Sequence, residues 1–158
     1  TLRLPYAMQL GSGTYDALPG LTYTGHNDVW SWGAQYAATI RLESENDQNY
    51  SLGDKHKISS WGGYQFTPWL RGTARVTAEH VGKIDGADAL IAAPLTTADP
   101  NNYGGDFVEA GIGFNLVPQK QLAGAQIACE FTAPLYQDLN GPQMKRDYGF
   151  TIGLQYSF

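Results

Sequence analysis

The sequence predicts an all-β protein: an antiparallel up-and-down transmembrane β-barrel to which this chain contributes seven or eight strands. Three observations support this prediction. Apolar and polar residues alternate in several segments, the connections between those segments are alternately short and long, and the composition combines few charges with many aromatic residues. Alternation with a period of two is typical of strands, because successive side chains point to opposite faces.

The composition suits strands that cross a membrane. The chain has 158 residues, which is enough for a single β-barrel domain over residues 1–158 or for the C-terminal segment of one. Charged residues make up 16% of it, against about 25% in soluble domains. No segment approaches the ~20 consecutive apolar residues of a membrane helix. Membrane strands instead alternate apolar residues with small polar ones.

Composition also excludes several classes of protein. The net charge of −5 leaves no basic patch for nucleic acid. The single cysteine, Cys129, permits no internal disulfide and gives no metal-site spacing. The start at Thr1-Leu2-Arg3 lacks the features of a signal peptide, so either that peptide has been removed or the chain is the C-terminal part of a longer protein, which we favour. We expect no cofactor and no metal.

The elements follow from the alternation. The predicted strands are residues 15–23, 30–41, 55–66, 70–79, 108–116, 122–133 and 148–158, with 2–10 as a possible eighth. Within 55–66, Trp61 falls among the polar positions, which indicates either a bulge or a side chain that fills the lumen. In 2–10, Pro5 is tolerable only at an edge or bulge, and Gly11-Ser12-Gly13 would form a tight hairpin turn.

The last predicted strand has the most regular pattern. Tyr148, Phe150, Ile152, Leu154, Tyr156 and Phe158 share one face, and small polar residues occupy the other. In an outer-membrane barrel the apolar face contacts lipid, and its aromatic residues lie at the two membrane interfaces. A terminal phenylalanine after alternating aromatics resembles the signal read by the barrel-assembly machinery. The predicted location is therefore the outer membrane of a Gram-negative bacterium, with outer-membrane lipid and lipopolysaccharide as partners.

The connections agree with that location. The predicted connections fall into two groups. Three are short, at 26–28, 67–69 and 117–120, and three are long and polar, at 43–54, 82–105 and 134–146. Outer-membrane barrels have short periplasmic turns and long external loops. The predicted interface aromatics are Trp30, Trp32, Tyr64, Phe66, Tyr148, Phe150, Tyr156 and Phe158. A soluble lipocalin-like barrel is the alternative, but long loops at one end and charged residues on the non-apolar face argue against it.

The polar faces of the strands supply the candidate functional residues. The predicted lumen-lining residues are Arg41, Arg71, Arg75, Glu79, Glu109, Gln126, Glu130 and Gln155. In a barrel of about eight strands, side chains fill the interior, and these charges would form a structural plug of ion pairs. In a barrel of about twelve or more strands, they would line a pore and set its selectivity.

Several segments resemble a known family. These are residues 8–16 (Met-Gln-Leu-Gly-Ser-Gly-Thr-Tyr-Asp), 99–105, 134–143 and the terminal Gln155-Tyr156-Ser157-Phe158. They resemble the proteobacterial outer-membrane transporters of the family named after the meta-pathway of phenol degradation. Members of that family have additional strands before the Gln-Leu-Gly-Ser-Gly segment. The resemblance therefore implies a transport barrel of which this chain is the C-terminal portion.

Other chemistry has weaker support. His26, His56 and His80 lie near predicted strand ends, and no two have metal-ligand spacing. His80 lies on the predicted lipid face, but no serine accompanies it, so a lipid-acting barrel enzyme is disfavoured. The acidic segments 43–47 and 99–106 are candidate Ca²⁺ loops without the spacing of an EF-hand.

The prediction is therefore a non-enzymatic barrel that passes small molecules through a polar lumen. The alternative is a non-conducting structural barrel whose external loops, 82–105 and 134–146, bind a partner or surface.

Overall fold

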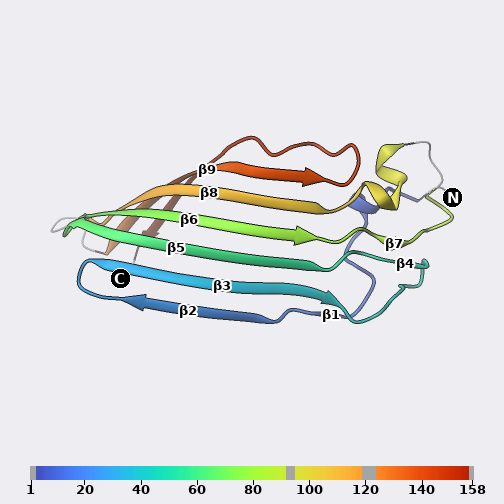
Figure 1. Ribbon diagram of the computed structural model, residues 1–158, viewed down its shortest axis with the longest axis horizontal. Coiled ribbons are helices and arrows are strands. Elements are labelled where there is room, and N and C mark those ends of the chain that lie inside the picture. The colour runs from blue at the N-terminus through green and yellow to red at the C-terminus, as the bar shows by residue number, and fades with distance from the viewer. Residues whose placement is uncertain (1–2, 92–94, 119–123, 157–158) are drawn as a thin grey trace.

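The computed structural model describes residues 3–91, 95–118 and 124–156, and these form an antiparallel all-β protein. The main sheet is a meander in which neighbouring strands follow one another along the chain (Figure 1). Its long strands are β2 (Gly20–His26), β3 (Trp30–Arg41), β5 (Lys55–Thr67), β6 (Leu70–Val81), β8 (Gly105–Leu116), β9 (Ala125–Leu139) and β10 (Gly149–Tyr156). The short strand β1 (Asp16–Ala17) pairs with the end of β3 next to β2. Within the described ranges, no helix has the length and apolar character needed to cross a membrane.

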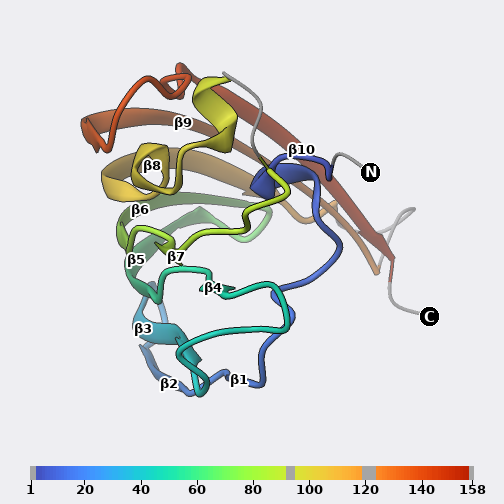
Figure 2. The same cartoon turned by 90° about the vertical axis from the view of Figure 1, so that its right-hand side faces the viewer.

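The sheet is curved and open. Viewed from its end, it forms an arc from β2 to β10 (Figure 2). Among the described residues, no strand joins β2 to β10, so the expected closed barrel is not formed by this part of the chain. Since each of the six successive pairings is antiparallel, β2 and β10 run in the same direction.

Most of the strand predictions are confirmed. The 30–41 segment coincides with β3, and 55–66, 70–79 and 108–116 each lie within one strand. The 148–158 segment corresponds to β10 over Gly149–Tyr156, whereas Phe158 lies outside the described residues. The short connections 27–29 and 68–69 lie at one end of the sheet, and the long connections 42–54 and 82–104 begin and end at the other (Figure 1). Residues 119 and 120 of the predicted short connection 117–120 lie outside the described residues.

Two boundaries differ from the predictions. Residues 15–23 are divided between β1 and β2, with Leu18 and Pro19 between them. The prediction that an external loop begins at Pro134 is wrong, because β9 continues to Leu139. The register shifts where Val108 faces Tyr136 and Glu109 faces Pro134, and a bulge tolerates a proline that lacks an N–H.

The predicted strand at 2–10 is also wrong. Tyr6–Met8 form a 3-10 helix, and Gly11-Ser12-Gly13 does not join two paired strands. Of the alternating apolar residues, Tyr6 is buried while Leu4, Met8 and Leu10 are exposed. A strand requires a pairing partner for its backbone, and these residues have none among the described strands.

The long connections and the segment before β1 together form a small core. β4 (Tyr50–Ser51) pairs with β7 (Asp85–Gly86), and Thr96–Ala98 and Pro100–Asn102 form further 3-10 helices. Tyr6, Tyr50, Ile84 and Ile91 pack together as the loop-end core. Residues 3–15, which we call the crossing segment, run from the β10 side to β1 over the open side of the arc (Figure 2).

Candidate functional site

The two faces of the sheet differ in polarity. Large apolar side chains are exposed on the convex face and polar side chains gather on the concave face, whereas a sheet in water exposes polar residues and buries apolar ones. On the convex face, Phe150, Ile112 and Leu154 are 64%, 62% and 78% exposed. On the concave face, the polar side chains of Ser59 and Thr77 are buried and hydrogen-bonded to each other at 3.1 Å. The candidate site is the concave face, where strand register brings polar side chains from six neighbouring strands together.

Arg75 lies at the centre of this site, near the middle of β6. Its Nε donates to Oε1 of Glu130 at 2.9 Å, and its Nη1 donates to Oγ1 of Thr77 at 3.3 Å. Glu109 Oε1 lies 4.0 Å from its Nη2. One guanidinium therefore lies between carboxylates from β8 and β9, and all three side chains are about one-third exposed.

Trp61 faces Arg75 across the β5–β6 pair and belongs to the concave face. The bulge suggested for Trp61 is absent, because the irregularity in this pair lies between Gln65 and Thr67. Its indole covers Gly33 on β3, where a Cβ atom would come within 2.3 Å of the ring. Trp61 projects over the polar face, and the alternative, that it fills the lumen, stays a prediction.

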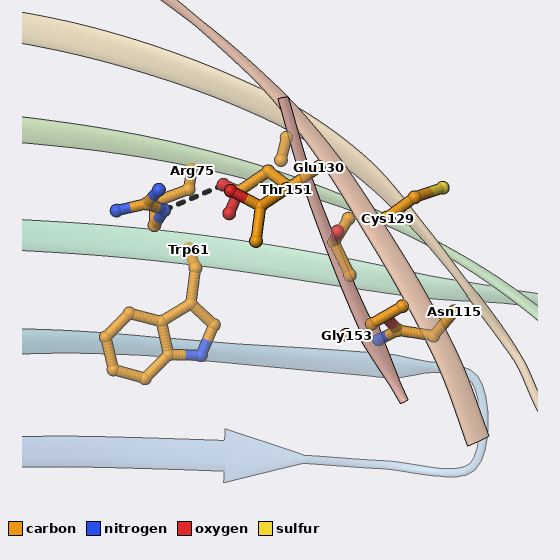
Figure 3. A pocket seen from close by; sticks show the side chains of 10 residues that line it. Trp61, Arg75, Asn115, Cys129, Glu130, Thr151 and Gly153 are labelled. Carbon is orange, nitrogen blue, oxygen red and sulfur yellow. Dashed lines mark hydrogen bonds and ion pairs between the residues drawn. The ribbon is translucent and has the colours of Figure 1, made fainter. Parts of the chain in front are cut away.

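A cavity of about 280 Å³ opens beside these residues (Figure 3). Its lining consists of Trp61, Thr73, Ala74, Arg75, Asn115, Ala128, Cys129, Glu130, Thr151 and Gly153. In Figure 3, Trp61, Arg75 and Glu130 project to the same side, whereas Cys129 points away from them. The lining combines hydroxyls, an amide, an indole and an ion pair with apolar surface from Ala74, Ala128 and Cys129.

Arg41 and Asp16 form a second charged pair, at the long-loop end of β3. Arg41 Nη1 donates to Asp16, whose carboxylate also accepts from Ser12 and Thr14, each at 2.8 Å. Burial raises the pKa of the Asp16 carboxyl, but these hydrogen bonds and the Arg41 charge outweigh it and lower the pKa below its ordinary value. This pair fastens β1 to β3, so Arg41 is a structural residue at the rim.

The remaining predicted lumen residues extend the polar face toward its two ends. Glu79 faces Lys57 in register and lies 4.0 Å from Arg146, and Arg71 donates to Gln65 at 2.9 Å. Gln126 faces Gln155 across the β9–β10 pair. The structure therefore brings Arg75, Glu109 and Glu130 together, and distributes the other five along the same face.

The predicted interface aromatics lie at both ends of the convex face. At the short-turn end, the ring of Tyr64 lies 4.7 Å from Trp30 and 5.1 Å from Phe66. Trp32 covers Gly25, and Tyr156 lies at the short-turn end of β10. Nearer the long loops, Phe150 faces Phe131, and Tyr148 stacks on Phe131 just before β10 begins. Phe158 is outside the described residues.

The histidines and acidic loops form no metal centre in the described ranges. His80 lies opposite His56 and Asp106, with Nδ1 2.6 Å from an Asp106 carboxylate oxygen, so its direct cross-strand neighbours include no serine. In the predicted calcium loops, Asn46 arranges a backbone turn, and Asp99 accepts from the Asn101 N–H at the start of a 3-10 helix.

Sequence reasoning missed several contributors to the site. Thr73, Asn115 and Thr151 line the cavity, and their alternation with apolar residues identified their face but gave no reason to choose them over other polar residues. No sequence pattern distinguished Gly33 and Gly111 from the other strand glycines either. Each leaves space for a side chain from a neighbouring strand, and only the structure shows which side chain occupies that space.

Comparison of the chain with protein-family models, with curated proteins and with solved structures finds no match to any of them. The resemblance to the outer-membrane transporter family therefore stays a prediction.

Proposed function

We propose that this chain forms part of an outer-membrane β-barrel through which small molecules pass by diffusion along a polar lumen. The observation that carries the proposal is the inverted polarity of the sheet. Large apolar side chains cover the convex face, and charged and hydroxyl side chains occupy the concave one. Water on the concave face and lipid on the convex face would solvate both surfaces favourably.

The height of the apolar surface supports a membrane location. At the long-loop end, His56, His80, Asp106 and Asp138 occupy one cross-strand row of the convex face. On the short-turn side of that row, Ile58 and Phe66 of β5 lie near the two limits of the apolar surface. The stretch 58–66 is as long as the ~9–11 residues with which a tilted strand crosses a membrane.

The membrane location can be tested by one substitution that destabilises a lipid-facing surface but is neutral on a water-facing one. Ile112→Lys on the convex face should destabilise the folded protein in bilayers by about 2–4 kcal/mol. Asn115→Lys on the concave face of the same strand is the matched control. If Ile112→Lys is neutral and the wild type folds in buffer without lipid, the membrane assignment is wrong.

Passage requires a barrel of more than about eight strands. Because β2 and β10 run in the same direction, antiparallel closure requires an odd number of further strands, whichever chain supplies them. A wider barrel leaves space between opposite walls, whereas one of about eight strands is filled by side chains. Arg75, Glu109 and Glu130 would then line an aqueous path and act on passing charges.

Planar-bilayer recording tests passage. We expect the wild-type protein to conduct and Glu130→Gln to shift the reversal potential in a salt gradient toward anion preference. Asp138→Asn removes the same charge from the same strand, but on the convex face, and should leave the reversal potential unchanged. Absence of conductance, or equal shifts from both variants, would contradict a lumen at Glu130 and favour the structural barrel.

A further inference from the structure

A second cavity lies at the long-loop end, under the crossing segment. It has a volume of about 310 Å³. Its lining consists of Tyr6, Ala7, Gln9, Gly11, Leu52, Gly53, Lys55, Val81, Gly82, Ile84, Tyr103 and Gly104. These residues come from the crossing segment, from the adjoining ends of β5 and β6, and from the connections before β5, after β6 and before β8, so the cavity exists only when those parts are assembled.

Tyr6 and Tyr103 of the lining are held in place by contact with each other and by bonds to residues outside the cavity. Arg3 Nη1 lies 2.7 Å from a carboxylate oxygen of Asp88, and the Asp88 N–H donates to the Tyr6 hydroxyl at 3.0 Å. The Tyr6 ring packs edge-on against Tyr103, whose hydroxyl donates to the Thr97 carbonyl. The phenol groups are thus occupied by protein partners.

Close backbone packing forms another part of the wall. A Cβ atom at Gly53 would lie 2.1 Å from the Gly82 carbonyl oxygen, and one at Gly104 would lie 2.3 Å from that of Val81. These distances leave no space for larger residues, so the connections meet backbone to backbone. A wall of this kind deforms little, which favours a cavity formed before any ligand enters it.

The charge of the lining is one-sided. Lys55 is the cationic residue in the lining, and no aspartate or glutamate belongs to it. None of the ion pairs found among the described residues involves Lys55. Leu52, Val81 and Ile84 supply apolar surface in the same lining. Apolar walls with one unpaired cation match a ligand that has an apolar body and one negative charge.

We propose that this cavity binds small amphipathic carboxylates, with the carboxylate at Lys55 and the apolar body between Tyr6, Ile84 and Tyr103. As a statement about what the barrel passes, this rests on the proposed function. As a statement about binding it stands alone, because binding is measured without passage.

The probe for the test is cyclohexanecarboxylate, with cyclohexanecarboxamide as the neutral molecule of the same shape. Binding to the purified protein is followed by saturation-transfer NMR, with protein-free lipid or detergent particles as the reference. We expect saturable binding of the carboxylate and at least about tenfold weaker binding of the amide, the loss expected for one charge-assisted hydrogen bond.

Two lysine variants distinguish the cavity from general charge attraction. Lys55→Met keeps the apolar bulk and should weaken carboxylate binding about tenfold while leaving binding of the amide unchanged. Lys57→Met is the matched control, since Lys57 lies two positions along the same face of β5 and does not line the cavity.

Three results would overturn the inference: no saturable binding, equal affinity for carboxylate and amide, or equal losses in the two lysine variants. A protein that binds but does not conduct would uphold this site and contradict the proposed function. A protein that conducts but does not bind the carboxylate would support the proposed function and contradict this site.

Discussion

Arg75 on β6 donates to Glu130 on β9 at 2.9 Å, although the whole of strand β8 lies between them. Gly111 on β8, directly opposite Arg75, makes this contact possible. A Cβ atom at Gly111 would lie 2.4 Å from the Glu130 carboxylate oxygen. The ion pair therefore crosses two strand spacings over a position that carries no side chain.

The first prediction concerns the energetic coupling of this pair. A double-mutant cycle of Arg75→Gln and Glu130→Gln should give a coupling free energy of about 0.5–1 kcal/mol, since both side chains are partly exposed. In a Gly111→Ala background the coupling should fall toward zero, because the new methyl group displaces the flexible carboxylate. The cycle with Glu109→Gln, at 4.0 Å, is the control and should show a weaker coupling. Equal coupling with and without Gly111→Ala would contradict the role of the glycine.

The second prediction concerns the space under Trp61. Gly33→Ala places a methyl group 2.3 Å from the indole and 2.9 Å from the Tyr23 carbonyl oxygen, so the ring and the strand must both shift. We expect a loss of about 1–3 kcal/mol in the free energy of unfolding, the usual range for overpacking. Gly62→Ala is the matched control on the facing strand, with its nearest contact at 3.9 Å. Comparable losses in both variants would show that strand glycines matter only for backbone flexibility.

The long strands were predictable because their alternation depends on local sequence alone. β3 is an example: Trp30, Trp32 and Tyr36 alternate with small or polar residues, and any partner strand preserves that division of faces. The same rule failed at residues 2–10, where the pattern is present but a pairing strand is absent from the described sheet. Alternation shows that a segment can form a strand. The strand forms only where a neighbouring strand offers hydrogen-bond partners for its backbone N–H and C=O groups.

The loop-end core was not predictable for a related reason. Tyr6 comes from the segment predicted as a strand, Tyr50 from the connection 43–54, and Ile84 and Ile91 both come from the connection 82–105. Only the sheet brings these segments together. The site shows the same limit: charge type and alternation placed Arg75 and Glu130 on one polar face, but their pairing across β8 depends on register and on Gly111.

The third prediction concerns the stability of the loop-end core. Tyr6→Ala removes a buried ring that contacts Tyr50 and Tyr103, and comparable losses in full cores cost about 3–5 kcal/mol. Because this core is separate from the sheet, we expect local opening rather than global unfolding. Hydrogen exchange should accelerate in residues 84–91 and remain slow in β5 and β6. Tyr6→Phe keeps the ring and loses the acceptor for the Asp88 N–H, so it should cost about 1–3 kcal/mol. Uniform acceleration throughout the sheet would show that the core and the sheet unfold as one unit.

The last prediction concerns Asp88 and pH. The Leu90 N–H donates to its carboxylate, and this hydrogen bond, with a smaller contribution from Arg3, outweighs burial and lowers the pKa of Asp88 below its ordinary value of 3.8. A carboxyl whose pKa is lowered by folding stabilises the folded state above the unfolded pKa, and this stabilisation is lost as the pH falls through the folded pKa. The crossing segment should therefore stay attached above pH 3.8 and loosen below it. Carbon-13 NMR of aspartate-labelled protein reports the titration directly, and Arg3→Gln should move its midpoint upward without reaching the ordinary value, since the Leu90 hydrogen bond remains. Lys145→Gln removes a positive charge that makes no ion pair with Asp88 and should leave the midpoint unchanged. A wild-type midpoint at or above 3.8 would mean that the bonds to Asp88 do not hold the segment in solution.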